Sequence, residues 1–438
     1  MINKLYAQLV PDASQLQLAD KIALALVAIA PLLMLSLRGW LNALLAAVFL
    51  LSVWHYAKKW RQGRNAPAKL DFWDKMLLLC LSAPFLAIFF SQMLRGQWND
   101  NPFDGPVRIL ASFVIFLYLR QMKFNVVKVL GLVLPLSLWI VLALVLLNPE
   151  LTARWGGRYA TYFVDPLTLG QYVLLLAFMC LALVHYHERP SLSLTLYQLS
   201  GFVIGVFLSF GSGSRSAWVA LPALVLIYLV FLRTKRKVSW VWFAAGAVIL
   251  PFVFLGHADL FLVRVSAAWS EWIQYFQQGH QDTSAGLRLS FIRAAWYLWL
   301  QSPWVGYGDG MTPNVMQIPA LAPIATPTLE FGIRHNGVHN ELMQNLLRSG
   351  VFGLLAYLAQ LLIPLVLFYK SARSTHAAVS SAGVLGLMYI SSIFFFGLST
   401  ETFNLKFTSS IYGLMVAILA AQCLSADPTV SPGKNHVS

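Results

Sequence analysis

Long runs of apolar residues, separated by short polar stretches, dominate the chain between residues 21 and 424. Most runs approach the roughly 20 apolar residues that a helix needs to cross about 30 Å of hydrocarbon. They lack the strict alternation of apolar and polar positions that is typical of membrane β-barrel strands. Because a backbone inside hydrocarbon must satisfy its own polar groups, the pattern predicts transmembrane α-helices.

The pattern therefore predicts an all-α polytopic membrane protein of about twelve transmembrane helices. A composition of 58% hydrophobic and 11% charged residues agrees with this class. The runs at 106–119 and 195–210 are short for a span. The expected spans are 21–37, 40–57, 75–94, 106–119, 126–147, 167–184, 195–210, 217–232, 238–256, 351–369, 378–398 and 408–424.

The net charge of +14 is distributed unevenly between alternate loops. The positive-inside rule assigns the loops rich in lysine and arginine to the cytoplasm, and an even number of spans then places both termini there. The basic residues of these loops are Lys58, Lys59, Arg61, Arg64, Lys69, Arg120, Lys123, Lys128, Arg233, Lys235, Arg236, Lys237, Lys370 and Arg373. The long segment 257–350 then faces outward.

On the outward side, eleven of the twelve basic residues are arginine, and Lys406 is the exception. Arginine offers a planar fork of donors that matches phosphate or carboxylate oxygens. The alternative reading is that lysine is simply disfavoured on that side by topology. The eleven arginines are Arg38, Arg95, Arg108, Arg154, Arg158, Arg215, Arg264, Arg288, Arg293, Arg334 and Arg348.

The outward segment divides the chain into three parts: helices 1–9 over residues 1–256, the loop 257–350, and helices 10–12 with a cytoplasmic tail over 351–438. Apolar residues at helical spacing predict an amphipathic interfacial helix over 260–278. A second helix is expected over 284–301, and a third from His339 to Leu347. The Pro-rich stretch 311–333 is expected to be irregular.

Several nucleotide- and metal-binding patterns are absent from the sequence. It contains no GxxxxGK[ST] loop and no Asp-x-Asp pair. Gly337 separates His335 from His339, and no third ligand has suitable spacing, so we expect no metal site. An enzyme acting on the outward side, where nucleotides are not supplied, would need a substrate already activated in the membrane.

Three outward sites carry candidate chemistry. Arg215 lies in a turn of small residues, where a charge at the edge of the hydrocarbon is costly unless it faces a partner or cavity. Arg288 is expected in the first turn of a helix, where an anion would be favoured. His339 is expected at a helix start, which should lower its pKa and leave a neutral base near pH 7. The structural alternatives are a snorkelling arginine and a histidine that bonds a carbonyl.

These motifs resemble those of the O-antigen ligase family, which is related to O-antigen polymerases and protein O-oligosaccharyltransferases. The resemblance rests on Ser-Arg-Ser-Ala-Trp at 214–218, Gly-Leu-Arg at 286–288, Ser-Pro-Trp-Val-Gly-Tyr-Gly at 302–308 and His-Asn-Glu at 339–341. It covers residues 150–400 and implies a fold similar to GT-C membrane glycosyltransferases. The implied location is the bacterial inner membrane, with the outward segment in the periplasm.

The resemblance implies transfer of a polysaccharide from undecaprenyl diphosphate to the lipid A-core oligosaccharide, without a metal or cofactor. It assigns catalysis to Arg215, Arg288 and His339, with the arginines on the diphosphate, His339 as the base and inversion at the anomeric carbon. Further substrate contacts are expected from Arg154, Arg158, Asp165, Arg293, Asn340 and Glu341.

Three alternatives to a ligase remain open. An O-antigen polymerase would use the same carrier with a different acceptor. A protein oligosaccharyltransferase is less favoured, because such relatives often carry an additional outer domain. A lipid-linked oligosaccharide transporter or flippase would be expected to show two related halves and broken helices at the bilayer midplane. The sequence shows neither feature, and its candidate residues all lie on one side.

Overall fold

A computed structural model describes residues 18–62, 69–122, 125–186, 191–231, 258–403 and 405–425. Over these residues the protein is entirely helical, without strands. Nine of the described helices are long and apolar enough to span a membrane. Residues 101–122 form one such span because a short 3-10 turn continues into α5. The other eight are α3 (Trp40–Arg61), α4 (Phe72–Arg95), α6 (Val126–Leu147), α8 (Pro166–Leu183), α9 (Leu192–Ser212), α16 (Glu341–Ala372), α17 (Ala377–Gly397) and α18 (Lys406–Ser425).

Two of the twelve predicted spans differ from this result, and a third is not tested by it. The predicted span 21–37 is the shorter helix α2 (Leu18–Ile29), followed by turns. The predicted span 217–232 is divided at Ala220 into α10 (Arg215–Val219) and α11 (Leu221–Phe231), which together form a shorter apolar helical stretch. The predicted span 238–256 lies outside the described residues. The short predicted spans 106–119 and 195–210 both correspond to helices of spanning length.

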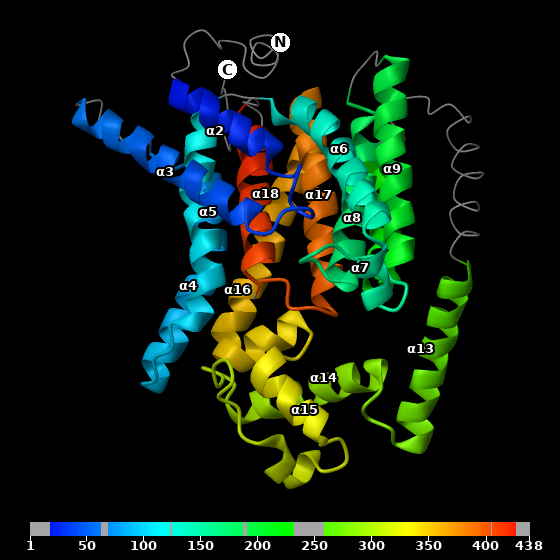
Figure 1. Cartoon of the computed structure of the whole chain (residues 1–438). Helices are drawn as coiled ribbons and strands as arrows, with labels where there is room; N and C mark the ends of the chain where they lie inside the picture. The colour runs from blue at the N-terminus through cyan, green and yellow to red at the C-terminus, as the bar shows by residue number, and fades with distance from the viewer. Residues whose placement is uncertain are drawn as a thin grey trace.

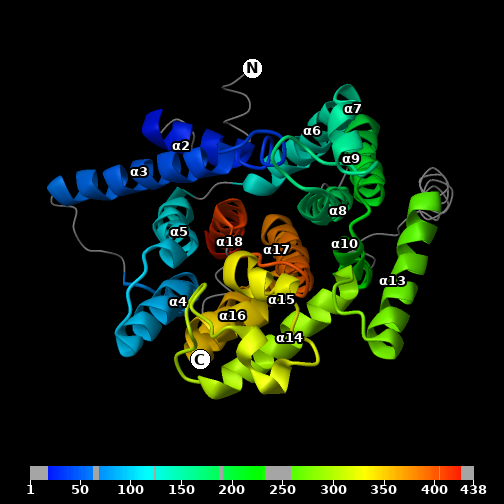
Figure 2. The ribbon, with the colours of Figure 1, turned by 60° about the horizontal axis from the view of Figure 1, so that its bottom comes forward.

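The spanning helices form a bundle with α17 and α18 near its centre (Figures 1 and 2). Every described side chain from Ile411 to Cys423 in α18 is buried. Small residues allow close helix packing, as is common in membrane proteins. A Cβ added to Gly205 of α9 would lie 2.6 Å from the Val173 carbonyl oxygen of α8, and one added to Gly413 of α18 would lie 2.3 Å from Ser112 Oγ of α5 (Asp104–Met122).

One end of the bundle is held by ionic and polar contacts between helix ends. Asp71 caps α4 and exchanges hydrogen bonds with Asp74 in a capping box. Arg120, at the end of α5, pairs with both carboxylates. Lys59 of α3 donates to Gln121 Oε1 at 2.7 Å. The described basic residues Lys59, Arg120 and Lys370 therefore gather at the same end of the bundle, since Lys370 also lies over the ring of Trp73.

Residues 258–340 lie at the opposite end, where α14 and α15 gather below the bundle and α13 stands to the right of them (Figure 1). The helices of this segment are α13 (Ala258–Gln278), α14 (Ser284–Gln301) and the short α15 (Pro327–Phe331). The two longer helices agree with the predicted ranges 260–278 and 284–301. The stretch predicted to be irregular contains α15 and two 3-10 turns, at Val315–Gln317 and Pro319–Leu321.

The segment has a small apolar core of its own. Phe291, Ala294, Ala295 and Leu298 of α14 pack with Leu329, Val338 and residues of the intervening loop. The predicted third helix begins at Glu341 and continues into the next span as α16, with a break at Gly350 (φ 59°). This break brings the α16 backbone against the loop at Trp304, since a Cβ on Gly350 would lie 2.4 Å from the Trp304 carbonyl carbon. The outer segment is thus joined rigidly to the bundle.

Candidate active site

Arg215 is the first residue of α10 and follows a turn that is held tightly against α8. Gly213 ends α9 in the left-handed conformation at φ 60°. Ser209 Oγ donates to the Gly170 carbonyl at 3.0 Å, and Ser214 Oγ donates to the Leu167 carbonyl at 3.0 Å. These serines therefore have structural roles, and the small side chains fix the position from which the Arg215 guanidinium extends. The Arg215 side chain keeps 29% of its surface exposed.

Arg288 is the fifth residue of α14, just beyond the first turn in which it was expected. The helix begins at Ser284 and is capped by Thr283, whose hydroxyl accepts from Gly286 N at 3.1 Å. Arg288 Nη1 reaches back to Ser284 Oγ at 2.9 Å. Within the described part of the chain, Arg288 Nε is buried and has no hydrogen-bond partner. The predicted start of the helix at residue 284 is confirmed, and Arg288 lies about one residue past its first turn.

Glu271 of α13 connects these two arginines. Its Oε1 lies 3.5 Å from Arg215 Nη2, and its Oε2 accepts from Ala285 N at the start of α14 at 2.9 Å. The pKa of Arg288 is lowered by burial and by the charge of Arg215, while the charge of Glu271 raises it. Two like charges are thus brought near each other with one carboxylate between them. Sequence reasoning missed Glu271, although it is the one carboxylate between Asp259 and Asp282.

His339 lies outside any helix, two residues before α16 begins. Its ring meets the ring of Phe291 edge-on, with 5.5 Å between the centroids. Phe291 and Arg288 are three residues apart and therefore share one face of α14. On this face, the Arg288 charge lies close enough to His339 to lower its pKa. The structure thus brings together Arg215, Arg288 and His339 from three separate segments at one end of the bundle.

The backbone at His339 is held in an unusual conformation. His339 has φ 50°, which is uncommon for a residue other than glycine. Its N–H donates to Glu401 Oε1 at 3.2 Å, and Val338 N donates to Gln344 Oε1 at 3.3 Å. A Cβ on Gly337 (φ 79°) would lie 1.8 Å from the same Glu401 oxygen, so only glycine fits there. Glu401, in the loop between α17 and α18, was not singled out from the sequence; an acidic residue in an outward loop was the available signal.

The pKa of His339 is lowered from its ordinary value, in the predicted direction. Burial by neighbouring protein is the larger cause, and the positive charge of Arg288 is the second. The helix end, which the sequence suggested as the cause, is not among them. His339 still keeps part of its surface open to solvent. The arrangement favours a neutral imidazole that can accept a proton from a substrate hydroxyl near pH 7.

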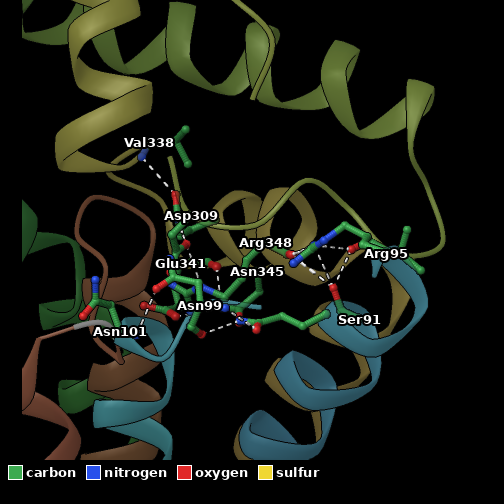
Figure 3. A network of polar contacts seen from close by, with 12 residues as sticks. Ser91, Arg95, Asn99, Asn101, Asp309, Val338, Glu341, Asn345 and Arg348 are labelled. Atoms are coloured by element: carbon green, nitrogen blue, oxygen red, sulfur yellow. Dashed lines mark hydrogen bonds and ion pairs between the residues drawn. The ribbon is translucent and has the colours of Figure 1, made fainter. Parts of the chain in front are cut away.

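A polar network beside His339 holds the glycine-rich loop 306–310 against the bundle (Figure 3). Arg348 is 5% exposed and donates from Nε to both oxygens of Asp309, at 2.8 and 2.9 Å. Gln344 Nε2 donates to Asp309 Oδ1 at 2.9 Å. Arg95 of α4 donates from Nη1 to the carbonyls of Val305 and Arg348, at 2.9 and 2.8 Å. Two of the outward-side arginines therefore stabilise the fold around the site.

Three of the predicted substrate-binding residues are used within the fold. Asn340 caps α16, accepting from Met343 N at 3.1 Å, and donates to the Leu398 carbonyl at 3.3 Å. Glu341 is 1% exposed and accepts from Phe403 N at 2.9 Å and from Asn345 Nδ2 at 2.7 Å. Asp165 caps α8, accepting from Leu167 N at 2.8 Å. Each of these side chains thus has a structural role, which sequence reasoning did not assign.

The remaining candidate arginines differ in their surroundings. Arg158 Nε donates to the Ser212 carbonyl at 2.8 Å, which places it beside the turn that carries Arg215. Arg154 is exposed at the end of α7 (Pro149–Arg154). Arg293 is exposed and donates to Tyr275 Oη at 3.3 Å, between α14 and α13. Of these three, Arg158 lies nearest in the structure to the turn of Arg215.

His335 and His339, which lie on either side of Gly337 in the sequence, do not form a pair. His335 stacks on Phe331, with 4.6 Å between the ring centroids, and its Nδ1 lies 3.1 Å from the Phe331 carbonyl oxygen. Among the described residues, no group of three or more His, Cys, Asp or Glu side chains is arranged to hold a metal ion. The chemistry open to this site is therefore anion binding by the arginines and proton transfer by His339.

Replacing Arg288 with methionine should raise the pKa of His339, because one of the two causes of its lowered value is the Arg288 charge. His339 would then protonate at a higher pH than in the wild-type protein. The pH dependence of His339 modification by diethyl pyrocarbonate, followed by mass spectrometry of its peptide, measures this change. Arg293→Met is the matched control on the same helix and should leave the profile unchanged. An unaltered profile in Arg288→Met would contradict the coupling.

Comparison with known proteins agrees with this geometry. Residues 200–358 match the family model described as O-Antigen ligase. An uncharacterized protein of Haemophilus influenzae is 23% identical over 342 residues, which cover 75% of this chain and 82% of that protein. The matched family region runs from α9 into α16 and contains Arg215, Arg288 and His339. The match over residues 200–358 supports an assignment to the O-antigen ligase family, and the fold with its helices of membrane-spanning length agrees with it.

Proposed function

We propose that this protein is an O-antigen ligase, which transfers a polysaccharide from undecaprenyl diphosphate to the lipid A-core oligosaccharide. The observation that carries the proposal is the convergence of Arg215, Arg288 and His339 within the region that matches the family. Placement in the bacterial inner membrane, with this end of the bundle in the periplasm, follows from the proposal and from the basic loops at the opposite end.

The arginines provide the electrostatic part of the mechanism. Glycosyl transfer passes through an oxocarbenium-like state, and the leaving oxygen gains negative charge. Here the leaving group is a lipid diphosphate, so positive groups that are already in place stabilise the charge as it grows. Arg215 and Arg288 are near each other, and Arg288 carries a buried donor without a protein partner. We assign both guanidinium groups to the diphosphate.

His339 provides the proton-transfer part. A neutral imidazole accepts the proton of the acceptor hydroxyl as the oxygen attacks the anomeric carbon, on the face opposite to the departing diphosphate. The configuration at that carbon inverts. The lowered pKa keeps His339 neutral at physiological pH, and Glu401 and Gln344 hold its backbone in place. No step requires a metal ion, because the two guanidinium groups carry the positive charge that stabilises the leaving group.

Replacing His339 with alanine should abolish polysaccharide transfer and leave binding of the lipid-linked donor nearly unchanged, because the imidazole acts on the acceptor. General-base contributions are about 100- to 10,000-fold in rate. A reconstituted transfer assay and a donor-binding measurement on the same purified protein separate the two effects. His335→Ala is the control, since that ring stacks on Phe331. Full transfer activity in His339→Ala would disprove the role.

Replacing Arg215 or Arg288 with alanine should weaken binding of undecaprenyl diphosphate and also slow transfer. Loss of a charge-assisted hydrogen bond corresponds to about 1.5–3 kcal/mol, or roughly 10- to 150-fold in affinity. Lysine variants should recover only part of the loss, because lysine keeps the charge without the planar fork. Binding isotherms in detergent or nanodiscs give the affinities. An affinity equal to that of the wild-type protein in both alanine variants would contradict the assignment.

A deletion strain separates a ligase from an O-antigen polymerase, which the family match supports equally well. Loss of a ligase should leave O-antigen on its lipid carrier and lipopolysaccharide without attached O-antigen. Loss of a polymerase should instead leave single repeat units attached to lipopolysaccharide. Gel analysis of lipopolysaccharide and of extracted lipid-linked intermediates distinguishes the two patterns, and complementation with the wild-type chain serves as the control.

A further inference from the structure

Glu271 is a carboxylate placed where a phosphate is expected to bind. It lies 3.5 Å from Arg215 Nη2 and is 17% exposed, and its charge also acts on Arg288. Two guanidinium groups and one carboxylate leave a net charge of one positive unit in this cluster. A diphosphate that binds both arginines would meet a like charge unless Glu271 withdraws. The negative charge of Glu271 therefore weakens binding of the diphosphate that this site is proposed to bind.

The contact between Glu271 and Arg215 is suited to exchange. Strong charge-assisted hydrogen bonds have lengths of about 2.7–2.9 Å, and the separation of 3.5 Å is well beyond that range. The other oxygen, Oε2, accepts from Ala285 N at 2.9 Å, a contact that a neutral amide oxygen can also make. In the described part of α13, Tyr275 is buried against α14 and accepts from Arg293 Nη1 at 3.3 Å, whereas the Glu271 side chain is 17% exposed. The carboxylate can leave Arg215 without disrupting a core.

Glu271 lies on a helix that has the character of a membrane–water interface helix. The same helix exposes large apolar side chains: Val265 is 49% exposed, Trp269 69%, Trp272 52% and Phe276 58%. Exposed tryptophans on an amphipathic helix are typical of the membrane–water interface. Trp272 is the direct neighbour of Glu271. Without the charge of Glu271, the positive charges of Arg215 and Arg288 beside this helix would attract any lipid phosphate, including those that are not substrates.

We propose that Glu271 is a specificity-determining residue, an internal competing anion that keeps singly charged phospholipid headgroups out of the arginine site and yields to a lipid diphosphate. This inference rests on the proposed function, since it assumes that Arg215 and Arg288 bind the donor diphosphate. A phosphodiester carries one negative charge and gains little over the carboxylate it must displace. A diphosphate carries at least two and can contact both arginines, so it displaces Glu271 at a net gain.

The test uses the full chain in nanodiscs of phosphatidylcholine with increasing fractions of phosphatidylglycerol, and undecaprenyl diphosphate as the probe. In the wild-type protein, the apparent Kd should change little as phosphatidylglycerol increases. Glu271→Gln should bind the probe about fivefold more tightly in pure phosphatidylcholine, the scale of a partly exposed ion pair. That advantage should disappear as phosphatidylglycerol increases, because the phospholipid now competes for the arginines.

Three further variants make the outcome unambiguous. Asp282→Asn removes a nearby carboxylate that accepts from the Thr326 hydroxyl, and it should behave like the wild-type protein. Glu271→Ala also removes the contact to Ala285 N, and it should show the same sensitivity to phosphatidylglycerol as Glu271→Gln. Equal sensitivity in the wild-type protein and Glu271→Gln overturns the inference. In that case Arg215→Ala separates the two possible failures. If this variant binds the probe like the wild-type protein, the proposed function fails as well. If it binds the probe more weakly, the proposed function stands and only the role of Glu271 is lost.

Discussion

Hydrocarbon does not solvate charge, so an ionisable side chain within a membrane needs a partner, a cavity or a position near the surface. This constraint separates the ionisable groups of the bundle into two ends. At one end, Arg120 pairs with Asp71 and Asp74 and joins α5 to α4. At the other end, Arg215, Arg288 and His339 come together on an outer segment. The apolar helices between them act as a scaffold that sets where each charged residue emerges.

The site combines two arrangements that are unfavourable by themselves. Arg215 and Arg288 are like charges near each other, and His339 has a backbone conformation that costs energy for a residue with a Cβ. In each case a carboxylate from another element compensates. Glu271 of α13 lies between the arginines, and Glu401 of the α17–α18 loop accepts from the His339 N–H. The site is therefore maintained by parts of the chain that carry none of the predicted catalytic residues.

Helix packing explains why the outer segment holds its position. Arg348 and Asp309 form a partly buried ion pair, and Arg95 of α4 donates to the carbonyls of Val305 and Arg348. The break at Gly350 allows the loop at Trp304 to approach the α16 backbone. Since α16 begins at Glu341, directly after the segment that carries His339, the same contacts that fix α16 also fix the base. Support for the site thus reaches from α4 through α16 to the loop before α18.

Much of the architecture was predictable, and the exceptions share one cause. Spans such as 126–147 and the helix at 284–301 follow from composition and caps, which are local properties of the chain. The division of the predicted span 217–232 at Ala220, and the contacts of Asn340 with Leu398 and of Glu341 with Phe403, depend on neighbours that the sequence does not place. Residues such as Glu271 and Glu401 carried only a weak signal, because a single acidic residue in an outward segment resembles any solvated one.

Arg215, Arg288 and His339 were candidates from the sequence, through their positions and through the family resemblance. The sequence by itself also determined that this is a helical membrane protein, and most of its predicted spans are helices of spanning length. These follow from the cost of placing polar backbone and charge in hydrocarbon, which acts on each segment separately. Only the tertiary structure decided that Arg215, Arg288 and His339 meet, that Arg288 lowers the pKa of His339, and that two carboxylates complete the site. Those results depend on distances between segments far apart in the chain, and such distances are set by packing.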